Sequence, residues 1–167
     1  MQLSICIITK NEEKNITRCL SCLQSYDFEI VVVDTGSTDN TKQIAKSYTE
    51  NVYDFSWCDD FAKAKNFAIS KATNEFVMMI DSDEYLEPLE AEKIVQFVQK
   101  HPNQVGRIKR RNLMTRNGVH QENVEWINRI FSKEKFSYEG CIHEQVVAKS
   151  GENYETYLTN VVIEHSG

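Results

Sequence analysis

The sequence of 167 residues predicts an α/β fold in which a parallel, doubly wound half (1–100) precedes a mixed, mostly antiparallel half (101–167). In the first half, short apolar runs that fit doubly buried strands alternate with amphipathic segments. This alternation favours right-handed crossovers between parallel strands. In the second half, Asn117-Gly118 separates two alternating segments and predicts a β-hairpin. We expect both halves to form one domain over residues 1–167.

The first half reads β-α-β-α-β-α-β. Its strands are expected at four apolar runs: residues 3–9, 29–33, 51–55 and 75–80. The first helix carries an apolar stripe at i, i+3, i+4 and i+7, namely Ile16, Cys19, Leu20 and Leu23. The third helix is expected to share one face among Phe61, Ala64, Ala68 and Ala72. Candidate helix N-caps are Asn15, Ser37 or Thr38, and Asp59 or Asp60.

One more helix is expected over residues 89–98, before the second half, and His101-Pro102 ends it. The strands of the second half are expected at four segments: residues 105–116, 124–131, 136–138 and 156–165. The sequence stops directly after the last of these, which is consistent with a longer parent protein or a missing C-terminal lid.

The charge and hydropathy of the sequence argue against two classes of protein, nucleic-acid-binding proteins and transmembrane proteins. The net charge of −6 argues against a nucleic-acid partner bound through its phosphates. The one basic cluster alternates as on a solvated strand face, although contact with an anionic substrate or a membrane surface stays open: Arg107, Lys109, Arg110, Arg111 and Arg116. No segment approaches the roughly 18 apolar residues of a transmembrane span, and no signal peptide precedes the first strand. We therefore predict a cytoplasmic protein.

The five cysteines are expected to be reduced and mostly buried thiols. Cys19 and Cys22 have the spacing of half a zinc site, but no second CxxC accompanies them. On a helix this spacing places both sulfurs on one face, so core packing is the better interpretation.

An acidic turn follows the last strand of the first half. Asp81, Asp83 and Glu84 come directly after the apolar run 76–80, where open α/β sheets bind ligands. Asp81 and Asp83 can reach one hard cation, which prefers oxygen ligands and accepts substrate phosphates. The three acids repel one another unless a cation lies between them. The alternative is a solvated acidic turn that caps the next helix.

Other polar residues are expected at the same edge of the sheet. They follow the first three strands: Thr9, Asn11 and Glu12, then Asp34, Thr35 and Gly36, then Asp59 and Asp60. Asp34 lies at the mouth between the first two strands, where a nucleoside's polar edge or ribose could be held.

These motifs, in this order and over essentially the whole chain, resemble an inverting family 2 glycosyltransferase with the GT-A fold. The matching segments are Ile7-Ile-Thr-Lys10-Asn11-Glu12-Glu13, Val33-Asp34-Thr35-Gly36-Ser37-Thr38-Asp39, Phe55-x-Trp57-x-Asp59-Asp60-Phe61, Ala64-Lys65-Asn66, Asp81-Ser82-Asp83-Glu84, Arg129-Ile130-Phe131, Tyr138-Glu139-Gly140-Cys141-Ile142-His143-Glu144 and Ile163-Glu-His165-Ser-Gly167. The resemblance makes residues 1–100 the nucleotide-binding half and 101–167 the acceptor-side half.

The resemblance implies a metal-assisted enzyme that takes its sugar from a nucleotide donor. The donor would be bound by Thr9, Asn11, Glu12, Asp34, Thr35, Lys65, Asn66 and Asp81. Mn²⁺ or Mg²⁺ would be held by Asp83 with Asp81, and His165 is a further candidate ligand that could equally be an exposed terminal histidine. Many relatives carry arginine in place of Lys65, and many carry a second acid, which contacts uracil, in place of Thr35. A uridine donor remains the commonest expectation.

Inversion requires a base that takes the proton of the acceptor hydroxyl, and Glu144 is the candidate. It follows His143 in a short polar turn that resembles the family's catalytic turn. The alternative is a surface carboxylate. The sugar and the acceptor, whether a glycan, a lipid-linked group, a peptide or a protein, are not readable, and a peripheral membrane contact or a homodimer stays open.

Two other functions compete with this one. Asp34-Thr35-Gly36-Ser37 is also the signature of aspartic proteases, in which two such loops share a proton. That all-β fold leaves no place for helices after Asp34 or near residues 60–71. The second alternative is a sugar-nucleotide-binding domain without turnover.

Overall fold

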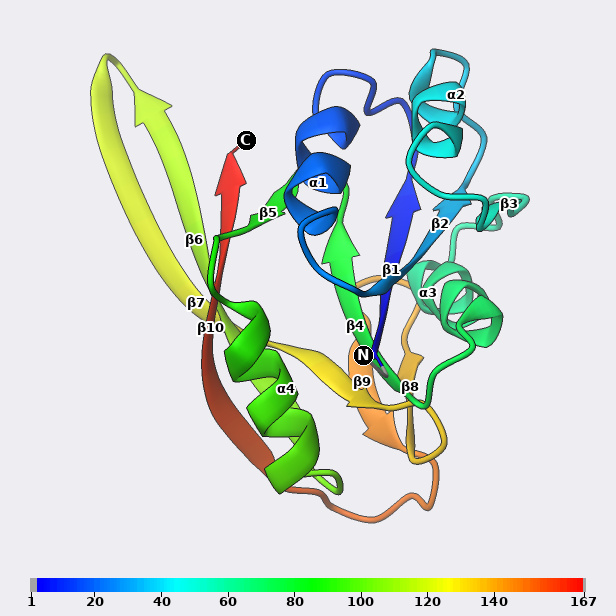
Figure 1. Ribbon diagram of the computed structural model, residues 1–167, viewed down its shortest axis with the longest axis vertical. Helices are drawn as coiled ribbons and strands as arrows, with labels where there is room; N and C mark the ends of the chain where they lie inside the picture. Colours follow the sequence, from blue (N-terminus) through cyan, green and yellow to red (C-terminus); the bar gives the residue numbers. More distant parts are fainter. Residues whose placement is uncertain (1–2, 167) are drawn as a thin grey trace.

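The computed structural model describes residues 3–166 and has the predicted α/β architecture (Figure 1). Its helices are α1 (Ile16–Leu23), α2 (Thr41–Lys46), α3 (Phe61–Lys71) and α4 (Ala91–Lys100). Its strands are β1 (Leu3–Thr9), β2 (Glu29–Asp34), β3 (Val52–Asp54), β4 (Phe76–Asp81), β5 (Glu84–Leu86), β6 (Val105–Arg116), β7 (Val119–Ser132), β8 (Phe136–Glu139), β9 (Gln145–Ala148) and β10 (Thr156–Ser166).

A sheet of eight strands in the order β3-β2-β1-β4-β7-β6-β10-β5 forms the centre of the molecule. The four strands predicted for the first half, β1 to β4, are parallel, and their register pairs Thr9 with Asp34 at the exits of β1 and β2. β7 joins β4 in the antiparallel sense, and β10 returns parallel to β6. The carboxyl ends of β1, β2 and β4 therefore meet at one edge, where ligands bind in such sheets.

Two layers cover the sheet. One apolar cluster packs α1, Ala45 of α2 and α4 against one face, and its side chains include Leu20, Ile94 and Phe97. The other cluster packs α3 and the small β8–β9 sheet against the opposite face. Ala64, Ala68 and Ala72 are buried as predicted, but Phe61, at the first residue of α3, is 41% exposed.

The turns explain where the prediction was right and where it was wrong. Asp60 caps α3 by accepting a hydrogen bond from the Lys63 backbone N–H at 2.9 Å. Asn15 makes no such bond, and α2 begins only at Thr41, so Ser37 and Thr38 are not its caps. Asn117 (φ 51°) and Gly118 (φ 75°) adopt the positive φ that the hairpin between β6 and β7 requires.

The remaining differences are local. Strands β5 and β9 were not predicted, and β7 begins earlier than expected, because the hairpin is paired up to Arg116 and Val119. Cys19 packs in the core beside Cys22, but Cys58 and Cys141 are exposed, so the thiols are free yet less buried than predicted. Because α2 and α3 follow Asp34, the protease alternative is wrong.

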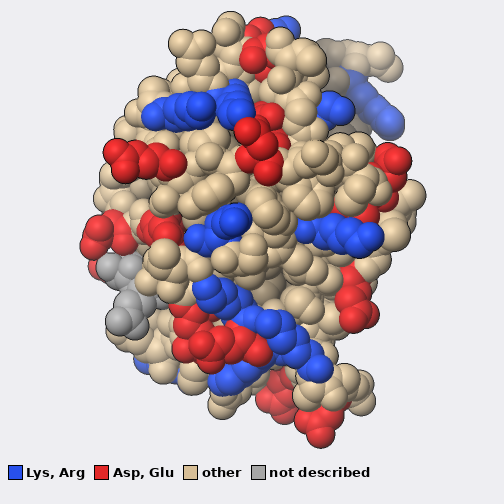
Figure 2. All heavy atoms as spheres, turned by 90° about the vertical axis from the view of Figure 1, so that its right-hand side faces the viewer, with Lys and Arg blue, Asp and Glu red and all other residues tan. Residues whose placement is uncertain are grey.

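The surface is mixed in charge. On the face that carries α2, β3 and α3, lysine and arginine side chains alternate with aspartate and glutamate (Figure 2). This face has no continuous basic patch of the kind that holds a phosphate backbone. Within residues 3–166 there is no helix long and apolar enough to span a membrane.

Candidate active site

A cavity of about 830 Å³ opens at the carboxyl ends of the parallel strands. Eight of the residues predicted from the sequence line it: Thr9, Glu12, Thr35, Lys65, Asp81, Asp83, Glu144 and His165. They come from both halves of the chain. Trp57 and Phe61 stand at this cavity with their rings edge to face, 4.8 Å between centroids. The fold thus gathers acids, a lysine, a histidine and exposed aromatic rings around one space.

Asp34 lies behind the cavity wall and carries an unused acceptor. Its Oδ1 accepts hydrogen bonds from the backbone N–H groups of Gly36 (3.0 Å) and Ser37 (2.9 Å). Its Oδ2 and the neighbouring Thr9 Oγ1 are buried and have no hydrogen-bond partner among the described residues. Buried polar atoms without partners are rare and costly, so these two atoms are suited to a ligand group.

Two predicted donor residues have other positions. Asn11 turns away from the cavity, where its Oδ1 accepts from the backbone N–H of Thr38 at 2.8 Å and so links the two strand exits. Asn66 bonds the backbone of Tyr138 in both directions, at 2.8 and 2.9 Å, which joins α3 to β8. Neither side chain lines the cavity, so their contribution is to hold the walls together.

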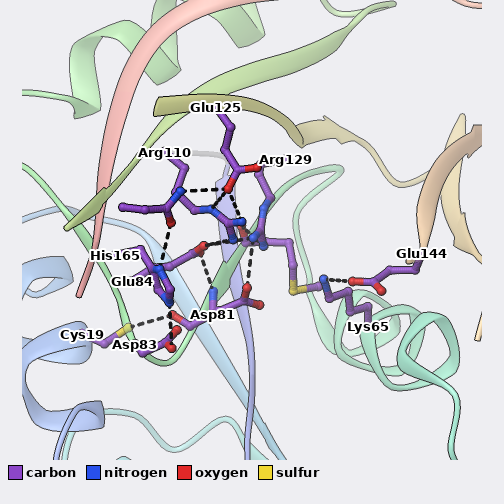
Figure 3. A network of polar contacts seen from close by, with 12 residues as sticks. Cys19, Lys65, Asp81, Asp83, Glu84, Arg110, Glu125, Arg129, Glu144 and His165 are labelled. Carbon is purple, nitrogen blue, oxygen red and sulfur yellow. Dashed lines mark hydrogen bonds and ion pairs between the residues drawn. The ribbon is translucent and has the colours of Figure 1, made fainter. Parts of the chain in front are cut away.

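Two arginines from β6 and β7 balance the charge of Asp81 and Glu84 in the acidic turn (Figure 3). Arg129 donates to Asp81 Oδ2 at 3.0 Å and to Glu84 Oε1 at 3.1 Å. Arg110 donates to the same Glu84 oxygen at 3.1 Å and also to Glu125. Burial raises the pKa of Asp81, but the Arg129 guanidinium outweighs it and holds that pKa well below its ordinary value. Burial raises the pKa of Glu84 despite both guanidiniums.

Arg129 is the cation that the described residues place between Asp81 and Glu84. The prediction that Asp83, with Asp81, holds a metal ion stays a prediction. Within residues 3–166, no cluster of three or more His, Cys, Asp or Glu side chains forms a metal site.

Asp83 and His165 form a separate pair, with 3.1 Å between Asp83 Oδ2 and His165 Nε2 (Figure 3). On the other side of the ring, His165 Nδ1 lies 2.9 Å from Asn112 Oδ1. The Asn112 amide is oriented by its Nδ2, which donates to Glu125 at 3.0 Å. Asn112 Oδ1 therefore accepts from His165 Nδ1–H, and the Nε2 lone pair of a neutral ring faces a carboxylate. Nε2 and the Asp83 carboxylate are then both acceptors, so their contact requires a proton or a metal ion between them.

Lys65 and Glu144 form the third feature of the cavity. The Lys65 ammonium, on a side chain only 7% exposed, makes an ion pair with Glu144, which is 17% exposed. Lys65 also lies 5.1 Å from the centre of the Tyr138 ring. Glu144 is thus a half-enclosed carboxylate at the cavity, held by a buried cation, and not a freely solvated surface residue.

Sequence reasoning missed the arginines of this site. The alternation of β6 places Arg110 on a solvated face, and Arg129 stands out only as part of a motif. The excess of cationic residues on a strand that follows an acidic turn in the chain is a signal for such pairs. It is ambiguous because the sequence does not give the strand pairing, and so does not give the partner of each arginine.

The comparisons with known proteins agree with this geometry. Residues 4–150 match the model of the protein family described as "Glycosyl transferase family 2". The Staphylococcus aureus poly(ribitol-phosphate) beta-N-acetylglucosaminyltransferase TarS is 34% identical over 131 residues, which cover 72% of this chain and 23% of TarS. An uncharacterized glycosyltransferase of Rickettsia typhi is 36% identical over 103 residues, which cover 62% of this chain and 35% of that protein.

Solved structures show the same fold. The structure of TarS 1–349 in complex with UDP-GlcNAc superposes with a TM-score of 0.62 at 34% identity, covering 72% of this chain and 37% of that one. Glucosyl-3-phosphoglycerate synthase from Mycobacterium tuberculosis, solved with Mn²⁺ and UDP-glucose, gives a TM-score of 0.55 at 21% identity over 66% of this chain and 43% of that one. The chain spans less than half the length of each of these proteins.

The α/β sheet, the acids at its carboxyl edge and the match over residues 4–150 lead to one conclusion: the chain has the GT-A fold and belongs to glycosyl transferase family 2.

Proposed function

We propose that residues 1–167 are the domain of a glycosyltransferase that transfers a sugar from a UDP-sugar to an acceptor hydroxyl with inversion, assisted by Mn²⁺ or Mg²⁺. The proposal rests on one observation. The polar residues at the strand ends, the Asp83–His165 pair and the Lys65–Glu144 pair all line the same cavity. TarS, the relative solved with UDP-GlcNAc, supports the uridine donor.

The nucleoside is proposed to lie at the exits of β1 and β2. Asp34 Oδ2 and Thr9 Oγ1 are the buried atoms without partners there, and Glu12 and Thr35 line the adjoining wall. A carboxylate oxygen can accept from a base N–H or from ribose hydroxyls. The Thr35 hydroxyl instead bonds the Thr9 carbonyl at 3.2 Å, so its role is to hold the two strand exits together.

The Asp83–His165 pair fits a divalent cation. A hard ion of this kind is commonly bound by one or two protein ligands together with substrate phosphates and waters. His165 has the hydrogen bond from Nδ1 that orients a metal-binding imidazole, and its Nε2 faces Asp83. When bound, the cation stabilises the negative charge on the departing nucleoside diphosphate.

Glu144 is the proposed base. Its carboxylate accepts the proton of the acceptor hydroxyl while the hydroxyl oxygen attacks the anomeric carbon. The bond from that carbon to the diphosphate oxygen breaks on the opposite face, and the configuration inverts. Lys65 orients Glu144 through their ion pair and keeps it at the cavity wall. A sugar-nucleotide-binding domain without turnover is the second candidate, since the chain spans only 23% of TarS.

The test is UDP binding by calorimetry, with and without Mn²⁺, for the wild type and Asp34→Asn. Asparagine can still accept the two loop hydrogen bonds through its amide oxygen but loses the charge. We expect a loss of about 1.5–3 kcal/mol, roughly 10- to 150-fold in Kd. Asp54→Asn, on the adjacent β3 with a side chain 70% exposed, is the control and should bind normally. Equal affinity of the Asp34 variant, or no UDP binding by the wild type, would contradict the proposal.

A further inference from the structure

The cavity contains a half-buried cation that the donor does not account for. Five cationic side chains line it: Lys10, Lys65, Arg107, Arg110 and Arg129. Lys65, Arg110 and Arg129 are ion-paired with carboxylates, and Lys10 is an exposed residue at the end of β1. Arg107 is half-buried and has no carboxylate within 4.0 Å among residues 3–166.

The Arg107 guanidinium uses little of its donor capacity. Its Nη2 donates to the Trp126 carbonyl at 3.0 Å, which fixes the plane of the group. Its Nε is buried and has no hydrogen-bond partner among the described residues. A guanidinium carries five N–H donors in a rigid fork that matches the two oxygens of a phosphate or a carboxylate.

A β-bulge explains why Arg107 lines the cavity. Gly106 pairs with Ile130 and Arg107 pairs with Asn128, so the ladder between β6 and β7 skips Arg129. Bulges bend a strand and re-aim its side chains, and they are common beside active sites. At the bulge the β6 backbone packs closely against the Phe97 ring. Glycine at position 106 permits this contact, because a Cβ there would lie 2.8 Å from the ring.

The position of Arg107 separates it from the proposed donor site. It comes from the β6–β7 wall in the second half of the chain, where Trp126, Ile127 and Asn128 also line the cavity. The donor diphosphate is assigned to another side of the cavity, where Asp83 follows β4 and His165 lies on β10. Trp126, whose backbone carbonyl accepts from Arg107, is half-exposed and lines the same cavity, where its ring offers an apolar face for the carbon skeleton of an acceptor.

We propose that Arg107 binds an anionic group of the acceptor, a phosphate or a carboxylate, and so selects charged acceptors. This inference rests on the proposed glycosyltransferase function and names the substrate class of the same cavity. Arg107 is a specificity-determining residue and takes no part in the proton transfer assigned to Glu144.

The experiment measures binding of three matched probes by NMR titration to protein saturated with UDP and Mg²⁺, which is diamagnetic. Glycerol is neutral, glycerol 3-phosphate carries a phosphate, and glycerate carries a carboxylate. The wild type should bind at least one charged probe tenfold or more tightly than glycerol, and the comparison of the two identifies the anion. Arg107→Gln should lose at least tenfold in affinity for that probe and retain its UDP affinity within twofold.

Two further variants make the result specific. Arg107→Lys keeps the charge but not the fork, so its affinity for the charged probe should fall between those of the wild type and Arg107→Gln. Lys109→Gln removes a neighbouring charge on β6 that does not line the cavity, and should leave all three affinities unchanged.

Three results would overturn the inference. Equal wild-type binding of charged and neutral probes would show that the cavity does not select an anion. A parallel loss of UDP affinity in Arg107→Gln would assign Arg107 to the donor diphosphate. Absence of UDP binding by the wild type would refute the proposed function and this inference with it, whereas the first two results leave the proposed function standing.

Discussion

Replacing Arg129 with methionine removes the cation from the centre of the acidic turn. Arg129 is 5% exposed and donates to Asp81, to Glu84 and, at 3.3 Å, to the Met79 carbonyl. Removing one partner of a buried ion pair costs about 3–5 kcal/mol, because it leaves a buried charge uncompensated. Glu84 keeps its bonds from Arg110 and from the Asp81 backbone N–H, so most of the loss falls on Asp81.

The structure places the expected loss at the lower end of that range. The Asp81 side chain is 34% exposed to the cavity, so water screens part of its charge once Arg129 is gone. We expect Arg129→Met to lower the free energy of unfolding by about 3 kcal/mol at pH 7, measured by urea denaturation in EDTA. Arg18→Met is the control, because Arg18 forms an ion pair of similar length, 2.9 Å to Glu164, but is 58% exposed. Its loss should stay below about 1 kcal/mol.

The pH dependence of the free energy of unfolding provides a second test of Arg129→Met. In the wild type, Arg129 depresses the pKa of Asp81, so this pair contributes stability above the unfolded pKa and loses it as pH falls through the lower folded value. Without Arg129, the pKa of Asp81 should rise above its unfolded value, and the pKa of Glu84, which burial already raises, should rise further. The penalty is then relieved as pH falls, so the difference between variant and wild type should shrink from pH 7 to pH 4.5. A loss under 1 kcal/mol, or a loss independent of pH, would refute this account of the network.

The remaining predictions concern the proposed chemistry. Asp83→Ala should abolish the Mn²⁺-dependent part of UDP binding in calorimetry while leaving the melting temperature of the metal-free protein nearly unchanged, since Asp83 is partly exposed, contacts His165 and takes no part in the arginine network. Unchanged affinity with and without Mn²⁺ would exclude Asp83 as a ligand. Glu144→Gln should bind UDP with an affinity within a few-fold of the wild type and lose sugar transfer by roughly 10²–10⁴-fold. Donor hydrolysis serves as the assay where no acceptor is in hand. Full transfer activity would eliminate Glu144 as the base and make Glu139 the next candidate.

Local pattern was sufficient for much of the first half of the fold. A parallel strand buried on both faces must be apolar throughout, and the helix between two such strands must present a stripe, so β1, β2, β4 and α1 are readable from periodicity. Because parallel strands end at one edge, the clustering of Thr9, Glu12, Asp81 and Asp83 around one cavity also followed from order along the chain.

Contacts between distant segments were not readable in this way. The bulge beside Gly106 skips Arg129 in the β6–β7 ladder, and one residue of register changes which wall a side chain faces. For this reason the sequence indicated a cation near Asp81 but not that the cation is Arg129 from β7. The pairing of Lys65 with Glu144 and the turning of Asn66 toward Tyr138 likewise depend on how α3 packs against β8 and the turn after it. Composition and periodicity set which residues are buried and in what order strands end, whereas the partner of each charged side chain depends on strand register and packing between elements far apart in the chain.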